Sequence, residues 1–252
     1  MTAFVNLGKE IVSATWMRAI GMRGKFRELR DRTAIIKPGA LPEEVCTDLV
    51  ERIDRIADQD THPRVWRDDV GSDTRILGFE HDMPDLMGHF QIPENIRAID
   101  DYLAIRTKSW LLMANRVLPK QNNAGSGGGM HRDSPFSHQV KCIWYLSDVS
   151  AKTGPFQYVP GSHLNAIRTR ARYPLGQSRI PTVAEPLTEV HADAGTLLVC
   201  DTKCIHGGKP IEEGARYAVT LYTYPSKDGT AELLKKSGID VGEVPINIRD
   251  QS

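Results

Sequence analysis

The sequence predicts a mainly β fold with helices near its N-terminus. From Trp110 onward, short runs of apolar and β-branched residues alternate with turn residues, a spacing that is typical of a sandwich or jelly roll. The β-like runs are 111–118, 140–146, 156–159, 196–200 and 216–224. Because β-sandwiches and barrels commonly reach about 250 residues, the chain of 252 residues allows one large domain or two small ones.

Residues 3–32 are the first expected helix and a basic run that follows it. Apolar residues recur at helical spacing at Phe4, Leu7, Ile11 and Ile20. Two interpretations are open: an amphipathic helix that contacts anionic lipid or a partner, and a helix that caps the domain with a solvated charged face. The sequence favours the capping helix over peripheral membrane contact by residues 3–32, because surface helices of this kind are common.

A second helix is predicted to begin near Leu41, where Pro42, Glu43 and Glu44 suit a helix N-terminus. Its apolar residues then fall on one face, at Val45, Leu49, Val50, Ile53 and Ile56. A short apolar stretch at 34–36 precedes it. Residues 58–93 are polar and are expected to be irregular, and a further helix is predicted over 94–107.

Composition narrows the class of protein. The chain is 40% hydrophobic, and 32 basic side chains balance 32 acidic ones. A disordered chain would be less hydrophobic, and a nucleic-acid binder usually has a basic excess, so we expect a globular protein with no nucleic-acid partner. The most apolar run, 110–114, is far shorter than the roughly 18 residues of a transmembrane segment, so none is expected.

The cysteines and the N-terminal residues predict a cytoplasmic protein. No two cysteines form a C-x-x-C pair, which argues against a zinc knuckle or a disulfide framework and favours a reducing compartment. Lys9, Glu10 and Arg18 interrupt the apolar run that a signal peptide would need. The four cysteines are Cys46, Cys142, Cys200 and Cys204.

The glycine run at 125–129 lacks the following Lys-Ser/Thr of a Walker phosphate-binding loop. We expect that it lets the chain approach another segment closely. The segment 164–190 is rich in Arg and Pro and is expected to be an insertion or a loop between strands.

A His-x-Asp pair, His131 and Asp133, follows the glycines directly. Residues i and i+2 of an extended strand project to the same side, so the imidazole and the carboxylate would converge. A facial iron site also needs a histidine from a distant strand. His206 lies 73 residues beyond Asp133, which leaves room for several strands between them.

A second pair, His191 and Asp193, competes with the first. His206 lies only 13 residues beyond Asp193, which is barely enough for a hairpin. The sequence therefore predicts His131, Asp133 and His206 as metal ligands, and His191 as a surface or loop residue.

Arg216 opens the last predicted strand, ten residues after His206. Its guanidinium group is suited to binding a carboxylate through two parallel hydrogen bonds. Ala218, Thr220 and Tyr222 share its strand face, which we expect to be the wet one. An arginine that extends to water from a strand end is the alternative; beside the two histidines and Asp133, the clamp is favoured.

Several motifs occur in a fixed order along the chain. They are Gly129-Met-His-Arg-Asp133, Ile143-Trp-Tyr-Leu-Ser-Asp-Val149 leading to Gly154-Pro155, Val159-Pro-Gly-Ser-His163, Gly195-Thr-Leu-Leu-Val199, His206 and Arg216. This series, within a region from about Ala34 to Tyr224, resembles the phytanoyl-CoA dioxygenase branch of the iron(II)- and 2-oxoglutarate-dependent oxygenases. The Pro-Gly-Ser-His element in its correct place makes the resemblance specific to this branch.

The resemblance implies a double-stranded β-helix, cupin-like, with flanking N-terminal helices. It implies one domain over 1–252, with a largely helical part at 1–108, a jelly-roll core at 109–225 and a C-terminal extension at 226–252. His131, Asp133 and His206 would bind iron(II), Arg216 would hold the distal carboxylate of 2-oxoglutarate, and dioxygen would be the other reactant.

Other residues are candidates for contact with 2-oxoglutarate. The family often has a hydroxyl residue two positions after the arginine, where this chain has Ala218, so Thr220 or Tyr222 is expected to take that role. Lys141 and Asn115 come from neighbouring predicted strands and are further candidates.

The implied reaction is hydroxylation of a small molecule, with release of succinate and carbon dioxide. Asp133 favours hydroxylation over halogenation, because related halogenases have a small residue in its place. Arg67, Arg75 and Arg168 are candidate contacts for an anionic substrate, or else solvated loop charges, and the same two interpretations apply to Arg64, Arg170, Arg172 and Arg179.

Two alternatives to hydroxylation stay open. The same iron centre serves desaturation or epimerisation equally well, and a non-catalytic jelly-roll protein would use the metal only structurally. Arg216 argues against the second, because a structural metal needs no carboxylate clamp beside it. No motif predicts an oligomeric state.

Overall fold

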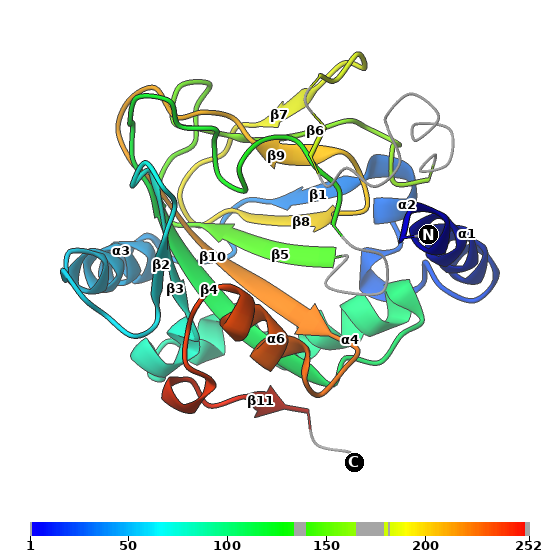
Figure 1. The fold of residues 1–252 in the computed structure, drawn as a ribbon, viewed down its shortest axis with the longest axis horizontal. Coiled ribbons are helices and arrows are strands. Elements are labelled where there is room, and N and C mark those ends of the chain that lie inside the picture. Colours follow the sequence, from blue (N-terminus) through cyan, green and yellow to red (C-terminus); the bar gives the residue numbers. More distant parts are fainter. Residues whose placement is uncertain (1, 134–139, 165–178, 181, 250–252) are drawn as a thin grey trace.

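Two antiparallel sheets dominate the computed structural model, which describes residues 2–133, 140–164, 179–180 and 182–249 (Figure 1). The main sheet has the strand order β1-β8-β5-β10-β4-β3-β2, with β11 also paired to β4. Its strands are β1 (Ala34–Lys37), β2 (Val65–Arg67), β3 (Asp73–Leu77), β4 (Ser109–Val117), β5 (Val140–Tyr145), β8 (Leu197–Asp201), β10 (Arg216–Tyr224) and β11 (Asn247–Ile248).

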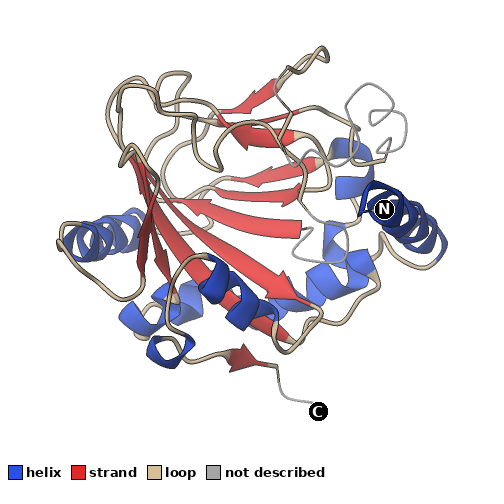
Figure 2. Ribbon diagram, viewed as in Figure 1, coloured by secondary structure: helices blue, strands red, loops and turns tan. Residues whose placement is uncertain are grey.

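The second sheet has the order β7-β6-β9 and lies above β1 and β8 in the view of Figure 2. Its strands are β6 (Phe156–Tyr158), β7 (Thr188–Val190) and β9 (His206–Gly208). From β5 to β10 the chain passes from the main sheet to the second sheet and back twice, as the strands of a jelly roll do. The mainly β, cupin-like fold with N-terminal helices is thus confirmed.

Two amphipathic helices, α3 (Glu43–Ala57) and α4 (Ile92–Leu103), pack against the main sheet. The buried side chains of Ile53 and Ile99 share one core cluster with Val219 of β10. In the same cluster the rings of Phe90 and Trp144 meet edge to face, with centroids 4.9 Å apart. These helices therefore cover the sheet face that points away from the second sheet (Figure 1).

Residues 58–93, expected to be irregular, contain strands β2 and β3 and two 3-10 helices, η2 (Phe79–Asp82) and η3 (Met87–Phe90). Because residues 73–75 are polar, β3 does not show the apolar pattern by which a strand is predicted. The strand forms because it pairs with β4 along its whole length, from Asp73 opposite Val117 to Leu77 opposite Met113. The helix predicted over 94–107 is α4, which ends earlier, at Leu103.

Short elements complete both ends of the fold. Before β1 come α1 (Thr2–Ala19), the 3-10 helix η1 (Gly24–Phe26) and α2 (Leu29–Arg32). After β10, α6 (Gly229–Lys236) packs Leu234 against Leu111 and Met113 of β4, and η4 (Val241–Glu243) leads to β11. In the described part of the chain, no helix combines the length and the apolar character needed to cross a membrane.

Candidate metal centre and cosubstrate site

His131, Asp133 and His206 come together between the two sheets. The main chains of His131 and His206 exchange both hydrogen bonds of an antiparallel bridge, at 2.8 and 2.9 Å, so the two rings lie side by side. The backbone nitrogen of Asp133 donates to the carbonyl oxygen of Thr202 at 3.0 Å, which fixes the backbone position of Asp133 relative to His131. One ligand atom from each of the three side chains lies within 4.8 Å of the others.

Backbone carbonyls orient both imidazoles. Nδ1 of His131 lies 2.9 Å from the carbonyl oxygen of Gly129, and Nδ1 of His206 lies 3.0 Å from that of Cys204. When Nδ1 donates its proton in this way, Nε2 is left unprotonated as the metal-binding atom. Burial lowers the pKa of the His206 imidazole to about 3, so this ring is neutral at physiological pH, as a metal ligand must be.

Two imidazole nitrogens and one carboxylate oxygen are the donor set of the facial triad that suits iron(II). The residues present therefore fit the metal that the sequence predicts. The competing pair does not converge in this way: His191 is exposed, and its Nε2 lies 2.9 Å from a carboxylate oxygen of Glu189. The structure thus brings His206 to the first His-x-Asp pair.

Lys141 lies beside the carboxylate of this cluster. From β5, its Nζ reaches to 2.7 Å from Oδ2 of Asp133 and lies 4.7 Å from the centre of the Tyr222 ring. Burial alone would lower the pKa of Lys141, but the charge of Asp133 and the Tyr222 oxygen outweigh it, and the pKa is raised. The side chain is therefore a buried cation beside the metal ligands.

Arg216 is buried at the start of β10, with 5% of its surface exposed. Its Nη1 donates to the carbonyl oxygen of Gly154, whereas its Nε is buried and makes no hydrogen bond to any residue that the structure describes. A buried guanidinium with an unused donor fits a ligand carboxylate, because the unpaired N–H costs free energy until an acceptor arrives. The site thus also fits 2-oxoglutarate.

The strand face that carries Arg216 was expected to be wet, and that prediction is wrong. Arg216, Ala218 and Thr220 are 2–5% exposed. β10 lies between β4 and β5 in the middle of the main sheet, and side chains from the second sheet join Ala218 in one core cluster. The face is therefore buried between the sheets and still points to the side where the metal ligands lie.

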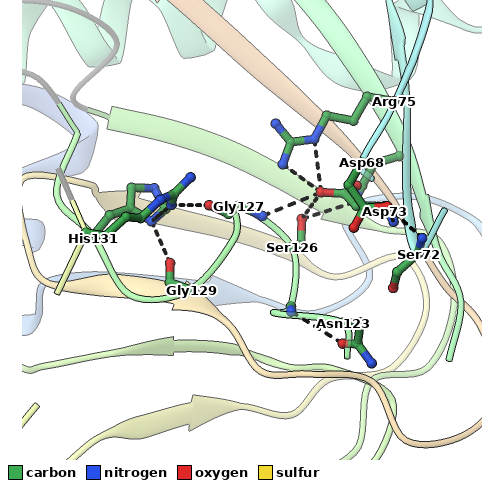
Figure 3. A network of polar contacts seen from close by, with 12 residues as sticks. Asp68, Ser72, Asp73, Arg75, Asn123, Ser126, Gly127, Gly129 and His131 are labelled. Atoms are coloured by element: carbon green, nitrogen blue, oxygen red, sulfur yellow. Dashed lines mark hydrogen bonds and ion pairs between the residues drawn. The ribbon is translucent and has the colours of Figure 1, made fainter. Parts of the chain in front are cut away.

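A polar network links Asp73 and Arg75 of β3 to the glycine loop that leads to His131 (Figure 3). Asp73 accepts hydrogen bonds from Arg75 at 2.6 Å and from the Ser126 hydroxyl at 3.1 Å, and the Asn115 amide lies 3.4 Å away. Burial raises the pKa of the Asp73 carboxyl, but the charges and hydrogen bonds of its partners, chiefly Arg75, hold it below its usual value. Arg216 is one of the charges that act on it.

The glycine run makes the close approach that its sequence predicts. Gly125 has a φ of +77°, and a Cβ there would lie 1.9 Å from the carbonyl oxygen of Gly208 in β9. The backbone nitrogen of Gly208 in turn donates to Ser126 at 3.0 Å. The loop can therefore lie directly against the strand that carries His206 and lead into His131.

The remaining candidates fall in different places. Thr220 is buried on β10 opposite Ile143 of β5, and Asn115 belongs to the Asp73 network. Arg67 donates to the carbonyl oxygens of Ala57 and Gln59 at the end of α3, and none of its hydrogen bonds reaches the metal cluster. Arg168 lies outside the described residues.

Two further charged residues lie near the site: Arg179, a candidate contact for an anionic substrate, and Asp73, which was not a candidate. Nη1 of Arg179 lies 3.3 Å from Nδ1 of His131 and donates to the carbonyl oxygen of Gly127. The sequence offers Arg179 as one of several arginines that would contact an anionic substrate, without indicating its contact with His131. Asp73 shares a strand face with Arg75, and this i, i+2 spacing of opposite charges is the one signal that pointed to it.

The comparisons with known proteins agree with this geometry. A family model described as "Phytanoyl-CoA dioxygenase (PhyH)" matches residues 33–216. A search among curated proteins gives no match.

Solved structures share the fold at low identity. The epimerase SnoN from nogalamycin biosynthesis has a TM-score of 0.59 at 16% identity, covering 79% of this chain and 81% of its own. EvdO2 from Micromonospora carbonacea var. aurantiaca, complexed with 2-oxoglutarate, has a TM-score of 0.57 at 18% identity, covering 79% and 89%. HygX from Streptomyces hygroscopicus, with nickel, 2-oxoglutarate and hygromycin B bound, has a TM-score of 0.53 at 18% identity, covering 81% and 87%.

The family match spans most of the chain and contains His131, Asp133, His206 and, at its end, Arg216. The protein therefore belongs to the phytanoyl-CoA dioxygenase family of oxygenases, which use iron(II), 2-oxoglutarate and dioxygen.

Proposed function

We propose that the protein hydroxylates a small anionic molecule and converts 2-oxoglutarate to succinate and carbon dioxide. The observation that carries the proposal is the convergence of His131, Asp133 and His206 in a fold that also buries the guanidinium of Arg216. When bound, iron(II) with 2-oxoglutarate and dioxygen supplies the oxidant that inserts one oxygen atom into a C–H bond.

Different side chains of the site have different proposed roles. His131, Asp133 and His206 would hold iron(II) through two imidazole nitrogens and one carboxylate oxygen. Arg216 binds the distal carboxylate of 2-oxoglutarate and so fixes the direction of the molecule. Thr220 and Asn115 line the same strand region as further contacts, and Lys141 orients Asp133. The covered interior between the sheets excludes water from the reacting atoms.

The charges around the site support an anionic substrate. The summed charge of iron(II), Asp133 and Arg216 cancels the charge of the two carboxylates of 2-oxoglutarate. The positive charge of Arg75 is balanced by its ion pair with Asp73. Lys141 and Arg179 remain as positive charges beside the ligands Asp133 and His131. A carboxylate or phosphate on the substrate would balance them.

Desaturation and epimerisation are the alternative outcomes at the same centre. SnoN, which shares the fold, is named as an epimerase, and SnoK from the same biosynthesis is named as a carbocyclase. Asp133 supports hydroxylation only against halogenation, because its carboxylate occupies a position that a halide would need.

We also propose a single oxygenase domain over residues 1–252 and a location in the cytoplasm. The four cysteines are buried free thiols, which suits a reducing compartment. The strands of the main sheet come from residues 34–248, which supports one domain.

The test couples turnover of 2-oxoglutarate to product analysis under isotopically labelled dioxygen. Small carboxylates and phosphates are offered beside neutral analogues, and succinate is measured with and without iron(II). We expect the anionic compounds, and not their neutral analogues, to stimulate succinate formation. One labelled oxygen should appear in succinate and one in the product. A desaturated or epimerised product that carries no labelled oxygen would contradict hydroxylation. Stimulation of succinate formation by neutral analogues would contradict an anionic substrate.

A further inference from the structure

The N-terminal helix α1 leaves an apolar face uncovered. Ile11, Val12, Trp16 and Ile20 are 43%, 60%, 48% and 37% exposed. They are half of the eight large hydrophobic side chains that are exposed in the described part of the chain. Val12, Trp16 and Ile20, the residue that directly follows α1, recur at intervals of four residues and form an apolar stripe along one side of the helix, and Ile11 lies beside Val12 at its edge.

The opposite side of α1 is held on the fold. Ser13 and Met17 are 1–2% exposed, and the ammonium group of Lys203 contacts Met17. Trp16 donates from its indole nitrogen to the carbonyl oxygen of Ala104 at 3.1 Å, although half of its side chain remains exposed. These contacts hold α1 in a fixed orientation, and the helix lies at the edge of the molecule beside α2 (Figure 1).

Basic side chains adjoin the stripe. Arg18 follows Ile11 by seven residues and so lies on the same helix face. Residues 18–32 contain six basic and two acidic side chains, a net charge of +4, in a chain whose net charge is zero. All eight are exposed: Arg18, Arg23, Lys25, Arg27, Glu28, Arg30, Asp31 and Arg32. The ion pairs of Arg30 with Asp31 and of Arg32 with Glu28 are loose, at 3.9 and 3.7 Å, and leave most of this charge available.

We propose that α1 and the basic segment to Arg32 dock this oxygenase on the surface of an anionic membrane. An amphipathic helix that lies in the plane of a lipid surface combines an apolar face with basic side chains and often an aromatic residue. The stripe would enter the boundary between headgroups and acyl chains, and Arg18 to Arg32 would bind the lipid phosphates.

Two observations favour lipid as the occupant of the stripe. A two-fold contact between two copies would place the same patch against itself, so that the positive segments would repel each other. The family match begins only at residue 33, so the fold of the family does not account for α1. The sequence favours a capping helix, but the structure shows that only one side of α1 caps the fold.

Sedimentation with vesicles tests the proposal on the full chain. The wild type is expected to sediment with vesicles of phosphatidylglycerol and phosphatidylcholine, to be released by high salt, and to stay in solution with phosphatidylcholine alone. Val12→Glu removes an apolar side chain and adds a charge that the lipid repels, so binding should weaken at least about tenfold. Arg23→Glu with Arg27→Glu should weaken it in the same way.

Val70→Glu is the matched control, because Val70 is also an exposed apolar residue, 40% exposed, but lies in the turn between β2 and β3. It should bind vesicles as the wild type does. Equal iron-dependent succinate formation and equal thermal midpoints show that the variants are folded. No binding by the wild type, or unchanged binding by Val12→Glu, would overturn the proposal. Dimerisation in sedimentation velocity that Val12→Glu abolishes would assign the face to a second copy instead and would also overturn it.

Discussion

Nζ of Lys141 lies 2.7 Å from Oδ2 of Asp133, while Oδ1 of the same carboxylate lies 3.6 Å from Nε2 of His131. The two carboxylate oxygens therefore face different partners. Lys141 neutralises the carboxylate from one side, and the other oxygen is left facing the metal-binding nitrogen. We infer that Lys141 holds Asp133 in the orientation that binds a metal through one oxygen.

Lys141→Met should destabilise the metal-free protein more than the metal-loaded protein. Without Lys141, the buried carboxylate of Asp133 loses its neighbouring cation, which typically costs about 3 kcal/mol for a buried pair. Bound metal supplies a positive charge in its place. The measurement is the free energy of unfolding with and without nickel(II).

Lys152→Met serves as the control, because Lys152 forms an exposed ion pair with Glu213 and should change neither value. An equal loss for Lys141→Met in both metal states would contradict the role given to Lys141.

His131→Ala should abolish iron-dependent succinate formation, while His191→Ala should leave most of it. Only the first histidine lies beside His206; the second is exposed against Glu189. Both substitutions remove an imidazole from a His-x-Asp pair, so each serves as the control for the other. If His191→Ala is the inactive variant, the wrong pair has been assigned.

Arg216→Ala should weaken binding of 2-oxoglutarate at least about tenfold, because a charge-assisted hydrogen bond is lost and a carboxylate is left unpaired in a partly dry site. Arg216→Lys keeps the charge without the planar fork and should fall between the alanine variant and the wild type. The measurement is titration of 2-oxoglutarate into each iron-loaded variant without oxygen. Metal should remain bound in both. Unchanged affinity in Arg216→Ala would leave Lys141 as the first residue to examine.

Glu80 should make the protein less stable as the pH rises towards neutrality. Its carboxylate oxygens accept hydrogen bonds from the Leu112 backbone nitrogen at 2.9 Å and from the Asn247 amide at 2.5 Å. Burial raises the pKa of Glu80 from 4.5 to about 7. The folded state thus keeps a proton that the unfolded state has lost. The stabilisation is complete below about pH 4.5 and is lost as the pH rises through about 7.

Glu80→Gln removes this titration. The free energy of unfolding of the variant, relative to the wild type, should rise between about pH 4.5 and pH 7, by up to about 3 kcal/mol. Denaturant unfolding at a series of pH values measures it. Glu94→Gln, which alters only an exposed ion pair with Arg97, should show no such slope. A difference for Glu80→Gln that does not change with pH would refute the account.

Helices and strands whose apolar residues recur at a regular spacing can be predicted from the sequence alone. α3 begins at Glu43, among the residues chosen as its N-terminus, and β10 spans 216–224 as expected. β3 could not be found in this way, because Asp73, Thr74 and Arg75 are polar and the strand depends on pairing with β4. The prediction that the strand face of Arg216 is exposed to water was wrong for a related reason. Alternation along one strand does not reveal that a second sheet covers that face.

The same distinction holds at the site. Motif order predicts His131, Asp133, His206 and Arg216, because each stands at a recognisable place in the sequence. The contact of Lys141 with Asp133 depends on where β5 lies relative to the loop before it, and no local pattern carries that information. The sequence named Arg179 only as one of several arginines near a possible anionic substrate, and its contact with His131, 48 residues away, could not be predicted from local pattern.

Anaerobic addition of iron(II) and then 2-oxoglutarate to the protein tests the central claim most directly. If His131, Asp133 and His206 hold the metal and Arg216 orients the keto acid beside it, the weak visible charge-transfer band of the bidentate chelate should appear in the wild type and in His191→Ala. It should be absent in His131→Ala. A wild-type protein that binds iron(II) but gives no band with saturating 2-oxoglutarate would contradict the account and favour a jelly-roll protein in which the metal is structural.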